Sequence, residues 1–271
     1  MRDAENVALS GLYVYPIKSC GGISTTSAEV GATGLLHDRR WMLVDEAGEF
    51  MSQRAHPRMA LISTRLSNEL LTVSAPGMPD LPIPLRQENG NLMDVEVLGD
   101  VNKGALVGEE ADLWFGEFLR FPCRLVRKPE DDPRPVDSIY ARSGDQTSFA
   151  DGFAFLLVSE ASLDDLNGRL EDPLPMNRFR PNFVVKGCDA YAEDGWDRLH
   201  IGGIPFRVAE ACPRCAITTT DQETAERGKE PLRTLATYRK FDGEVHFGRN
   251  LIHDGPGIVR VGDAVETTPR P

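Results

Sequence analysis

Residues 128–151 read KPEDDPRPVDSIYARSGDQTSFAD and divide the sequence into two parts. This segment is rich in proline and charge and has few apolar anchors, which is typical of a linker or a functional loop. On both sides of it, short apolar runs alternate with turn residues, which favours β-strands. Helical patterns are too few for a parallel βαβ architecture. The sequence therefore predicts a mainly β protein with a few helices (α+β), organised as units at 6–127 and 128–268.

In the first unit, short apolar runs predict strands and one amphipathic run predicts a helix. The strands are expected at 12–17, 23–30, 41–44, 59–66, 70–75 and 93–98. The helix is expected at 109–120, because five apolar residues fall broadly on one side of it, namely Ala111, Leu113, Trp114, Phe115 and Phe118. Glu109 and Glu110 favour its start, since negative charge stabilises a helix N-terminus.

The second unit begins with a continuous apolar run at 153–158 that suits a buried strand. A capping-box pattern at Ser162 then predicts a short helix that carries Leu163, Leu166 and Leu170 at helical spacing. The remaining apolar runs predict strands at 182–186, 198–201, 206–210, 216–220 and 258–261.

Charge and cysteine content exclude several classes of protein. The 271 residues include 42 acidic and 30 basic side chains, a net charge of −12, which disfavours binding to nucleic acid or to anionic membranes. No apolar run reaches the roughly 18 residues of a spanning helix, and the first residues lack the pattern of a signal peptide. Five scattered cysteines indicate reduced thiols. We therefore expect a soluble cytoplasmic protein.

The densest candidate site is Ala211-Cys212-Pro213-Arg214-Cys215, a C-x-x-C motif between two expected strands. A structural zinc site needs about four ligands, and the sequence offers no second pair. A thioredoxin-like dithiol usually opens a helix, whereas residues 216–220 are β-branched and favour a strand. A third interpretation is one thiolate on a soft metal centre, with Arg214 stabilising negative charge. Two buried structural cysteines remain the plain alternative.

Four further motifs carry groups that bind anions. In YPIKSCGG, Lys18 and Ser19 precede two glycines whose amides could complete an anion cradle. In HDRRW, strand alternation sends Arg39 and Arg40 to opposite faces, so at most one points into a given site. The other two motifs are RFRPN, with Arg180 and Asn182, and FGRN, which ends at Asn250. For each of them the plain alternative is a solvated surface group.

Together, YPIKSCGG, HDRRW, RFRPN, CDAYAEDGW, ACPRC and VGD resemble MOSC-domain proteins that carry an attached MOSC N-terminal β-barrel domain. That family includes amidoxime-reducing components and hydroxylaminopurine reductases. The resemblance implies a MOSC N-terminal β-barrel-like domain at 6–127 and a MOSC β-barrel domain at 128–268.

The resemblance also implies a molybdenum pyranopterin cofactor. It makes Cys215 the thiolate ligand of the metal and the catalytic residue. The other residues that it expects at the cofactor are Lys18, Ser19, Arg39, Asp151, Gly152, Phe153, Arg180, Asn182, Cys212, Pro213, Arg214 and Asn250. A phosphate dianion on the pterin would suit these arginines, because guanidinium groups offer forked, permanently charged donors.

By resemblance, the activity is the reduction of N-hydroxylated compounds such as hydroxylaminopurines, amidoximes and hydroxylamines to amines. No cysteine-rich run for a fused iron–sulfur cluster is present, so a separate flavoprotein reductase, ferredoxin or cytochrome is expected to supply electrons. Asp151 and His253 are both available as proton donors. Alternatives are a sulfur carrier with a Cys215 persulfide, a pyridoxal-phosphate protein using Lys18, and a cofactor-free binding module.

Overall fold

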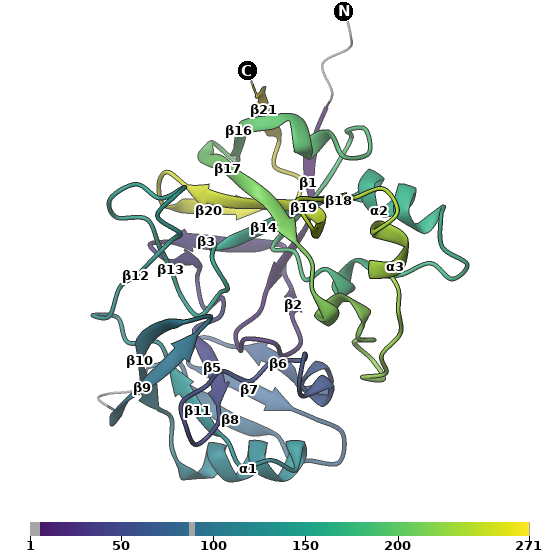
Figure 1. Cartoon of the computed structure of the whole chain (residues 1–271). Helices are drawn as coiled ribbons and strands as arrows, with labels where there is room; N and C mark the ends of the chain where they lie inside the picture. The colour runs from purple at the N-terminus through teal and green to yellow at the C-terminus, as the bar shows by residue number, and fades with distance from the viewer. Residues whose placement is uncertain (1–5, 87–89, 271) are drawn as a thin grey trace, which may run out of the picture.

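The computed structural model of the chain describes residues 6–86 and 90–270. Most of its regular structure is β-strand, in one large sheet and several small ones (Figure 1). This confirms the predicted fold class. The helices are α1 (Glu109–Leu119), α2 (Glu160–Asn167) and α3 (Leu232–Leu235), and 3₁₀ turns lie at Pro57–Leu61, Met176–Arg178, Ala192–Gly195 and Ala216–Thr219.

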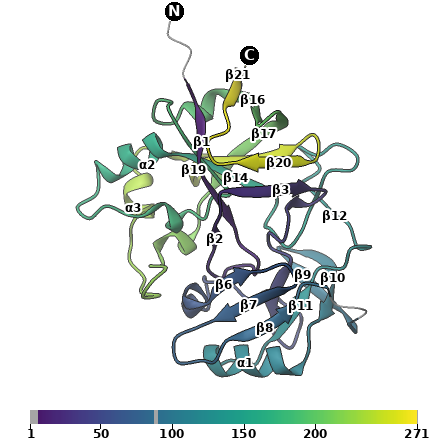
Figure 2. The same cartoon turned by 180° about the vertical axis from the view of Figure 1, so that it is seen from behind.

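The large sheet combines strands from both ends of the chain. Its order is β2-β1-β15-β14-β19-β17-β16-β21, and β18 pairs with β19. The bounds are β1 (Ala8–Val14), β2 (Ile23–Ser24), β14 (Phe155–Ser159), β15 (Phe183–Lys186), β16 (Trp196–Ile201), β17 (Ile204–Pro213), β18 (Lys240–Phe241), β19 (Glu244–His253) and β21 (Val265–Pro269). Because β1 pairs with β15, the first strand lies among strands of the second half (Figure 2). The division of the sequence at residue 128 stays a prediction.

The small sheets complete the architecture. One contains β5 (Trp41–Val44), β11 (Arg124–Arg127), β10 (Asp100–Leu106) and β9 (Leu92–Val97). Another contains β6 (Ser63–Leu66), β7 (Leu70–Ser74) and β8 (Leu81–Pro84). The others are β20 (Gly257–Arg260) with β3 (Ser27–Gly31) and β4 (Gly34–Leu35), and β12 (Arg134–Pro135) with β13 (Gln146–Thr147). Strand β3, from the first half of the chain, therefore pairs with β20, which lies near the C-terminus.

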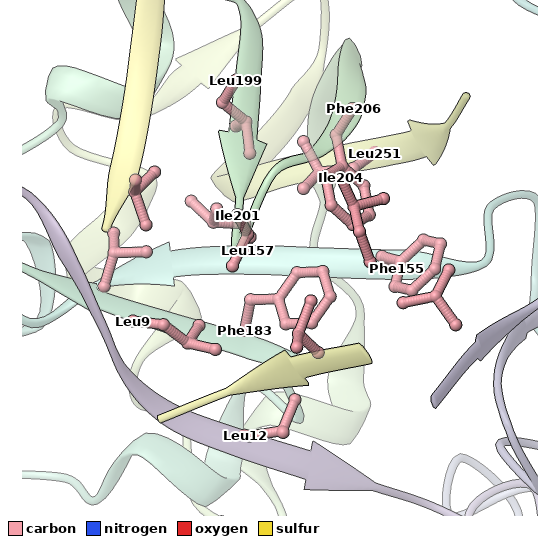
Figure 3. Packing of buried hydrophobic residues seen from close by; sticks show 14 of the residues in the cluster. Leu9, Leu12, Phe155, Leu157, Phe183, Leu199, Ile201, Ile204, Phe206 and Leu251 are labelled. Carbon is pink, nitrogen blue, oxygen red and sulfur yellow. The ribbon is translucent and has the colours of Figure 1, made fainter. Parts of the chain in front are cut away.

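Apolar side chains from β1, β14, β15, β16, β17 and β19 form the main core (Figure 3). The ring of Phe155 stacks on Phe183 at 5.2 Å between centroids and meets Phe206 edge-on at 5.3 Å. Every residue of β14 is buried, as its uninterrupted apolar run predicts. Strand β14 runs parallel to β15, and α2 lies in the connection between them.

A second core lies under α1. Trp114, Phe115 and Phe118 pack with Trp41 and Leu43 of β5, which confirms the predicted helix. The helix ends where Arg120 adopts a left-handed conformation with φ of 55° and its N–H donates to the Gly116 carbonyl.

Four predicted elements differ from the structure. The expected strand at 23–30 is interrupted after Ser24, because β2 pairs with β1 whereas β3 pairs with β4 and β20. Residues 216–220 form a 3₁₀ turn rather than a strand, because the Thr218 and Thr219 hydroxyls donate to the carbonyls three residues earlier, at 3.0 and 2.8 Å. The expected strand at 59–66 begins only at Ser63, after a 3₁₀ turn that starts at Pro57. Helix α2 is capped by Ser159, not by Ser162, since the Ser159 hydroxyl accepts from the Ser162 N–H.

Candidate functional site

A cavity of about 1110 Å³ is lined by segments from the whole length of the chain. All twelve predicted site residues lie on its wall, although they come from six separate places in the sequence. They are Lys18, Ser19, Arg39, Asp151, Gly152, Phe153, Arg180, Asn182, Pro213, Arg214, Cys215 and Asn250. Cys212 lines the same cavity. The fold brings the residues together, and their roles toward a ligand stay predictions.

The two cysteines of the C-x-x-C motif differ in their surroundings. Cys215 is half-buried just beyond the end of β17, at the start of the 3₁₀ turn, and Nη1 of Arg54 lies 3.8 Å from its Sγ. Arg214 Nη1 lies 3.0 Å from Sγ of Cys212, whose pKa burial raises. None of the five cysteines, all of which lie in the described residues, is in a disulfide, and Cys20 and Cys123 are buried in the core below α1.

Lys18 is a buried lysine that is already paired. Its ammonium donates to the Phe149 carbonyl at 2.8 Å and to the Asp151 carboxylate. Burial opposes ionisation of Asp151, but Lys18, together with Arg54 and Arg39, outweighs this effect and lowers the pKa of Asp151 to about 2. Asp151 is therefore a carboxylate at neutral pH. The predicted glycine cradle is incorrect in one respect, because the Gly21 N–H donates to the Ile62 carbonyl at 2.8 Å.

Arg39 points into the cavity and Arg40 does not. The Arg39 guanidinium donates to the buried Asp38 carboxylate and to Asn182 Oδ1 at 3.0 Å. Arg40 instead donates to the Lys128 carbonyl at 2.9 Å and to Glu130. One of the two arginines faces the cavity, as predicted, but strand alternation is not the cause, because both residues precede β5 and Arg39 has a left-handed φ of 48°.

The carboxamide of Asn182 is used within the protein. Its Oδ1 accepts from Arg39 and from the Leu156 N–H, and its Nδ2 donates to the Tyr13 carbonyl and to Asp38. The carboxamide of Asn182 therefore orients Arg39, and its hydrogen-bonding atoms are already used within the protein.

Tyr15 supports two cavity arginines at once. The guanidinium carbons of Arg39 and Arg180 each lie 4.4 Å from the centroid of its ring. Burial raises the pKa of Tyr15 to about 12, so the ring stays neutral. Among residues 6–86 and 90–270, no hydrogen-bond acceptor is paired with the Arg180 guanidinium. That side chain remains available to an anion.

Several lining residues lack a sequence signal. Arg54 comes from the loop after β5, and Arg134 donates to the carbonyls of Ser148, Ala150 and Asp151, which fixes the loop that carries Asp151. Glu210 lies on β17, where it reads as an ordinary strand residue. Only their positions in the fold reveal that they face the cavity.

Cationic and acidic side chains line the cavity in nearly equal numbers, seven against six, whereas the whole chain has a net charge of −12. The cations are Lys18, Arg39, Arg54, Arg134, Arg178, Arg180 and Arg214, and the acidic residues are Asp100, Asp132, Asp137, Asp151, Glu210 and Glu244. The buried Nε of Arg214 has no hydrogen-bond partner in the described part of the chain. Such a site can bind an anionic group beside an accessible thiol.

Two findings concern metals and membranes. In the part of the chain that the structure describes, no group of three or more His, Cys, Asp or Glu side chains is placed to hold a metal ion. Within the same residues, no helix is both long and apolar enough to cross a bilayer.

Two families match the chain. The MOSC N-terminal beta barrel domain matches residues 6–122, and the MOSC domain matches residues 144–266. Mitochondrial amidoxime-reducing component 1 from Mus musculus is 40% identical over 94% of this chain and 80% of the relative. The same component from Homo sapiens is 39% identical over 94% and 81%. Mitochondrial amidoxime reducing component 2 from Bos taurus is 40% identical over 95% and 82%.

Proposed function

This chain belongs to the family of the mitochondrial amidoxime-reducing components, and from that premise we propose that it is a molybdenum-cofactor oxidoreductase. Its substrates are N-hydroxylated compounds, including amidoximes, hydroxylamines and hydroxylaminopurines, which it reduces to amines. The observation that carries the proposal is identity of about 40% to named amidoxime-reducing proteins along almost the whole chain. The convergence of Cys215 and the cavity cations supports it.

The cavity fits a molybdenum pyranopterin in two respects. The Arg180 guanidinium and Nε of Arg214 are donors without a hydrogen-bond acceptor in the described part of the chain. The phosphate of a pterin would be a suitable acceptor for such donors. Cys215 offers a half-buried sulfur, and thiolates are suitable ligands for soft metal centres. Cys215 would hold the metal. Lys18, Ser19, Arg39 and Arg180 would surround the pterin and its phosphate.

When bound, the cofactor supplies the two-electron redox chemistry. The chain's own residues hold the cavity side chains in fixed directions and pair some of their charges. Asp38 and Asn182 fix the direction of Arg39, and Arg134 fixes the backbone before Asp151. The Lys18–Asp151 pair keeps one carboxylate ionised at the cavity wall. Because the arginines are positioned before any ligand binds, little ordering is needed when an anion enters.

We also propose that electrons arrive from a separate protein in the cytoplasm. The donor would be a flavoprotein reductase, a ferredoxin or a cytochrome. The net charge of −12 favours a donor whose docking surface is basic, since complementary charge accelerates encounter.

The test is amidoxime reduction by the molybdenum-loaded protein with reduced viologen as electron donor. The wild type should turn over, and Cys215→Ala should lose activity. Cys188→Ala is the matched control, because Cys188 is also a partly exposed cysteine outside any disulfide but does not line the cavity. Full activity of Cys215→Ala would contradict the proposal. A metal-free protein with cyanide-labile sulfur on Cys215 would indicate the sulfur carrier instead.

A further inference from the structure

Reduction of an N–O bond consumes protons, so the cavity needs a group that donates them. Asp151 cannot serve at neutral pH, because its pair with Lys18 keeps it ionised. His253 lies outside the cavity wall, where its ring contacts Phe155 at 5.5 Å between centroids. Neither of the two donors suggested by the sequence is therefore suitable.

Glu210 is a carboxyl group in the right place. It lies on β17, the strand that leads to the Cys212–Cys215 turn, and its side chain lines the same cavity as Cys215. Asn250 Nδ2 donates to its Oε1 at 3.3 Å from the neighbouring strand β19, and the Tyr140 hydroxyl also hydrogen-bonds to it. No lysine or arginine forms an ion pair with it in residues 6–86 and 90–270.

The groups around Glu210 favour its protonated form. Burial raises its pKa, and the neighbouring carboxylates of Asp137 and Glu244 raise it further, while the hydrogen bonds from Asn250 and Tyr140 oppose this effect. Cys212, which also faces the cavity from β17, is a neutral thiol whose pKa burial raises. Glu210 is thus held by Asn250 without a cation that would fix its charge, in contrast to Asp151.

We propose that Glu210 is the general acid of this reduction, a catalytic assignment that rests on the proposed function. For a hydroxylamine, R–NH–OH, two protons and two electrons give R–NH₂ and water. The N–O bond breaks, the separate donor protein supplies the electrons, and nitrogen is reduced. Glu210 delivers its proton to nitrogen. Solvent supplies a second proton to the hydroxyl oxygen, which leaves as water. Another solvent proton then restores the protonated form of Glu210.

The test compares Glu210→Gln and Glu210→Asp with the wild type, with rates expressed per bound molybdenum. Glu210→Gln should lower kcat about 100-fold with little change in KM, because general acids typically contribute at least that factor. Glu210→Asp should recover part of the rate. Glu266→Gln is the control, since Glu266 is an exposed residue of β21 in the same sheet.

The pH profile supplies a second readout. In the wild type, kcat should fall as pH rises through the raised pKa of Glu210, and this limb should be missing from Glu210→Gln. In the cofactor-free protein, ¹³C NMR of labelled glutamate should show a signal, absent from Glu210→Gln, that titrates above the ordinary range of glutamate. Wild-type kcat in Glu210→Gln, or an ordinary titration of Glu210, would overturn the assignment. An inactive wild type would instead overturn the proposed function, and this assignment with it.

Discussion

At the scale of single residues, Arg39 illustrates how the site is prepared for an anion. Its guanidinium is held by Asp38 and Asn182 and lies over the ring of Tyr15. Asp38 is 4% exposed and also accepts from the Tyr15 N–H at 2.8 Å. This buried carboxylate therefore connects the Tyr15 backbone to the side chains of Arg39 and Asn182.

We predict that Asp38→Ala destabilises the protein by about 3 kcal/mol, because removing one partner of a buried ion pair leaves the other charge uncompensated. Urea unfolding monitored by circular dichroism measures the change. Asp197→Ala is the control, since Asp197 is 43% exposed and lies 3.8 Å from Arg198, where a pair contributes less than about 1 kcal/mol. Equal losses in the two variants would contradict this account of Asp38.

At the scale of elements, the pattern of apolar residues predicted most of the strands and helices that have a buried face. The strand at 41–44 and helix α1 were found because a buried face leaves a periodic pattern. The 3₁₀ turn after Cys215 was missed, because its β-branched residues favour a strand until their hydroxyls bind the local backbone. The site motifs were recognisable by resemblance. Glu210 and Arg54 were missed because their importance arises only from long-range packing.

Gly248 of β19 gives a prediction at this scale. It has φ of +79°, and an added Cβ would lie 2.6 Å from the Leu157 carbonyl oxygen. Gly248→Ala should therefore cost more than the roughly 1–2 kcal/mol of left-handed strain alone. Gly243→Ala isolates that strain, since φ there is +88° and no atom lies within 4 Å. Thermal unfolding of both variants measures the difference. A Tm for Gly248→Ala no lower than that of Gly243→Ala would be the contrary result.

At the scale of the whole molecule, the cavity depends on contacts between distant parts of the chain. Gln53 and Gln222 exchange two hydrogen bonds of 3.0 Å. Arg227 donates to the carbonyls of Gln53 and Arg54. These contacts hold the loop after β5 so that Arg54 reaches Cys215.

Removing the hydrogen bonds from Arg227 to the loop after β5 should weaken cofactor binding, although every residue of the cavity wall is kept. We expect Arg227→Met to lower molybdenum retention or turnover about 10-fold, a size common for residues that position a metal's immediate surroundings. Arg233→Met is the control, because Arg233 is 70% exposed and, among the residues that the structure describes, its side chain pairs only with nearby Glu230. Metal analysis after dialysis and amidoxime turnover are the two readouts. Retention and turnover equal to those of Arg233→Met would show that the contact is dispensable.

The overall charge predicts a salt effect on electron delivery. With a basic donor protein, the second-order rate of reduction should fall as salt rises from about 0.05 to about 0.5 M, because counterions screen the attraction. Stopped-flow absorption follows the donor directly. Reduced viologen, a small donor without a protein docking surface, serves as the reference. Rates independent of salt would argue against steering by the net charge of −12.

The most direct test of the central claim is the molybdenum content of the purified protein, measured by elemental analysis beside Cys215→Ser. We predict molybdenum in amounts equimolar with the wild-type chain and a large loss from the variant, since Cys215 is a half-buried thiol on the cavity wall and is the ligand that the proposed function assigns to the metal. A wild type that is purified from cells supplied with molybdate and contains no molybdenum would contradict the account.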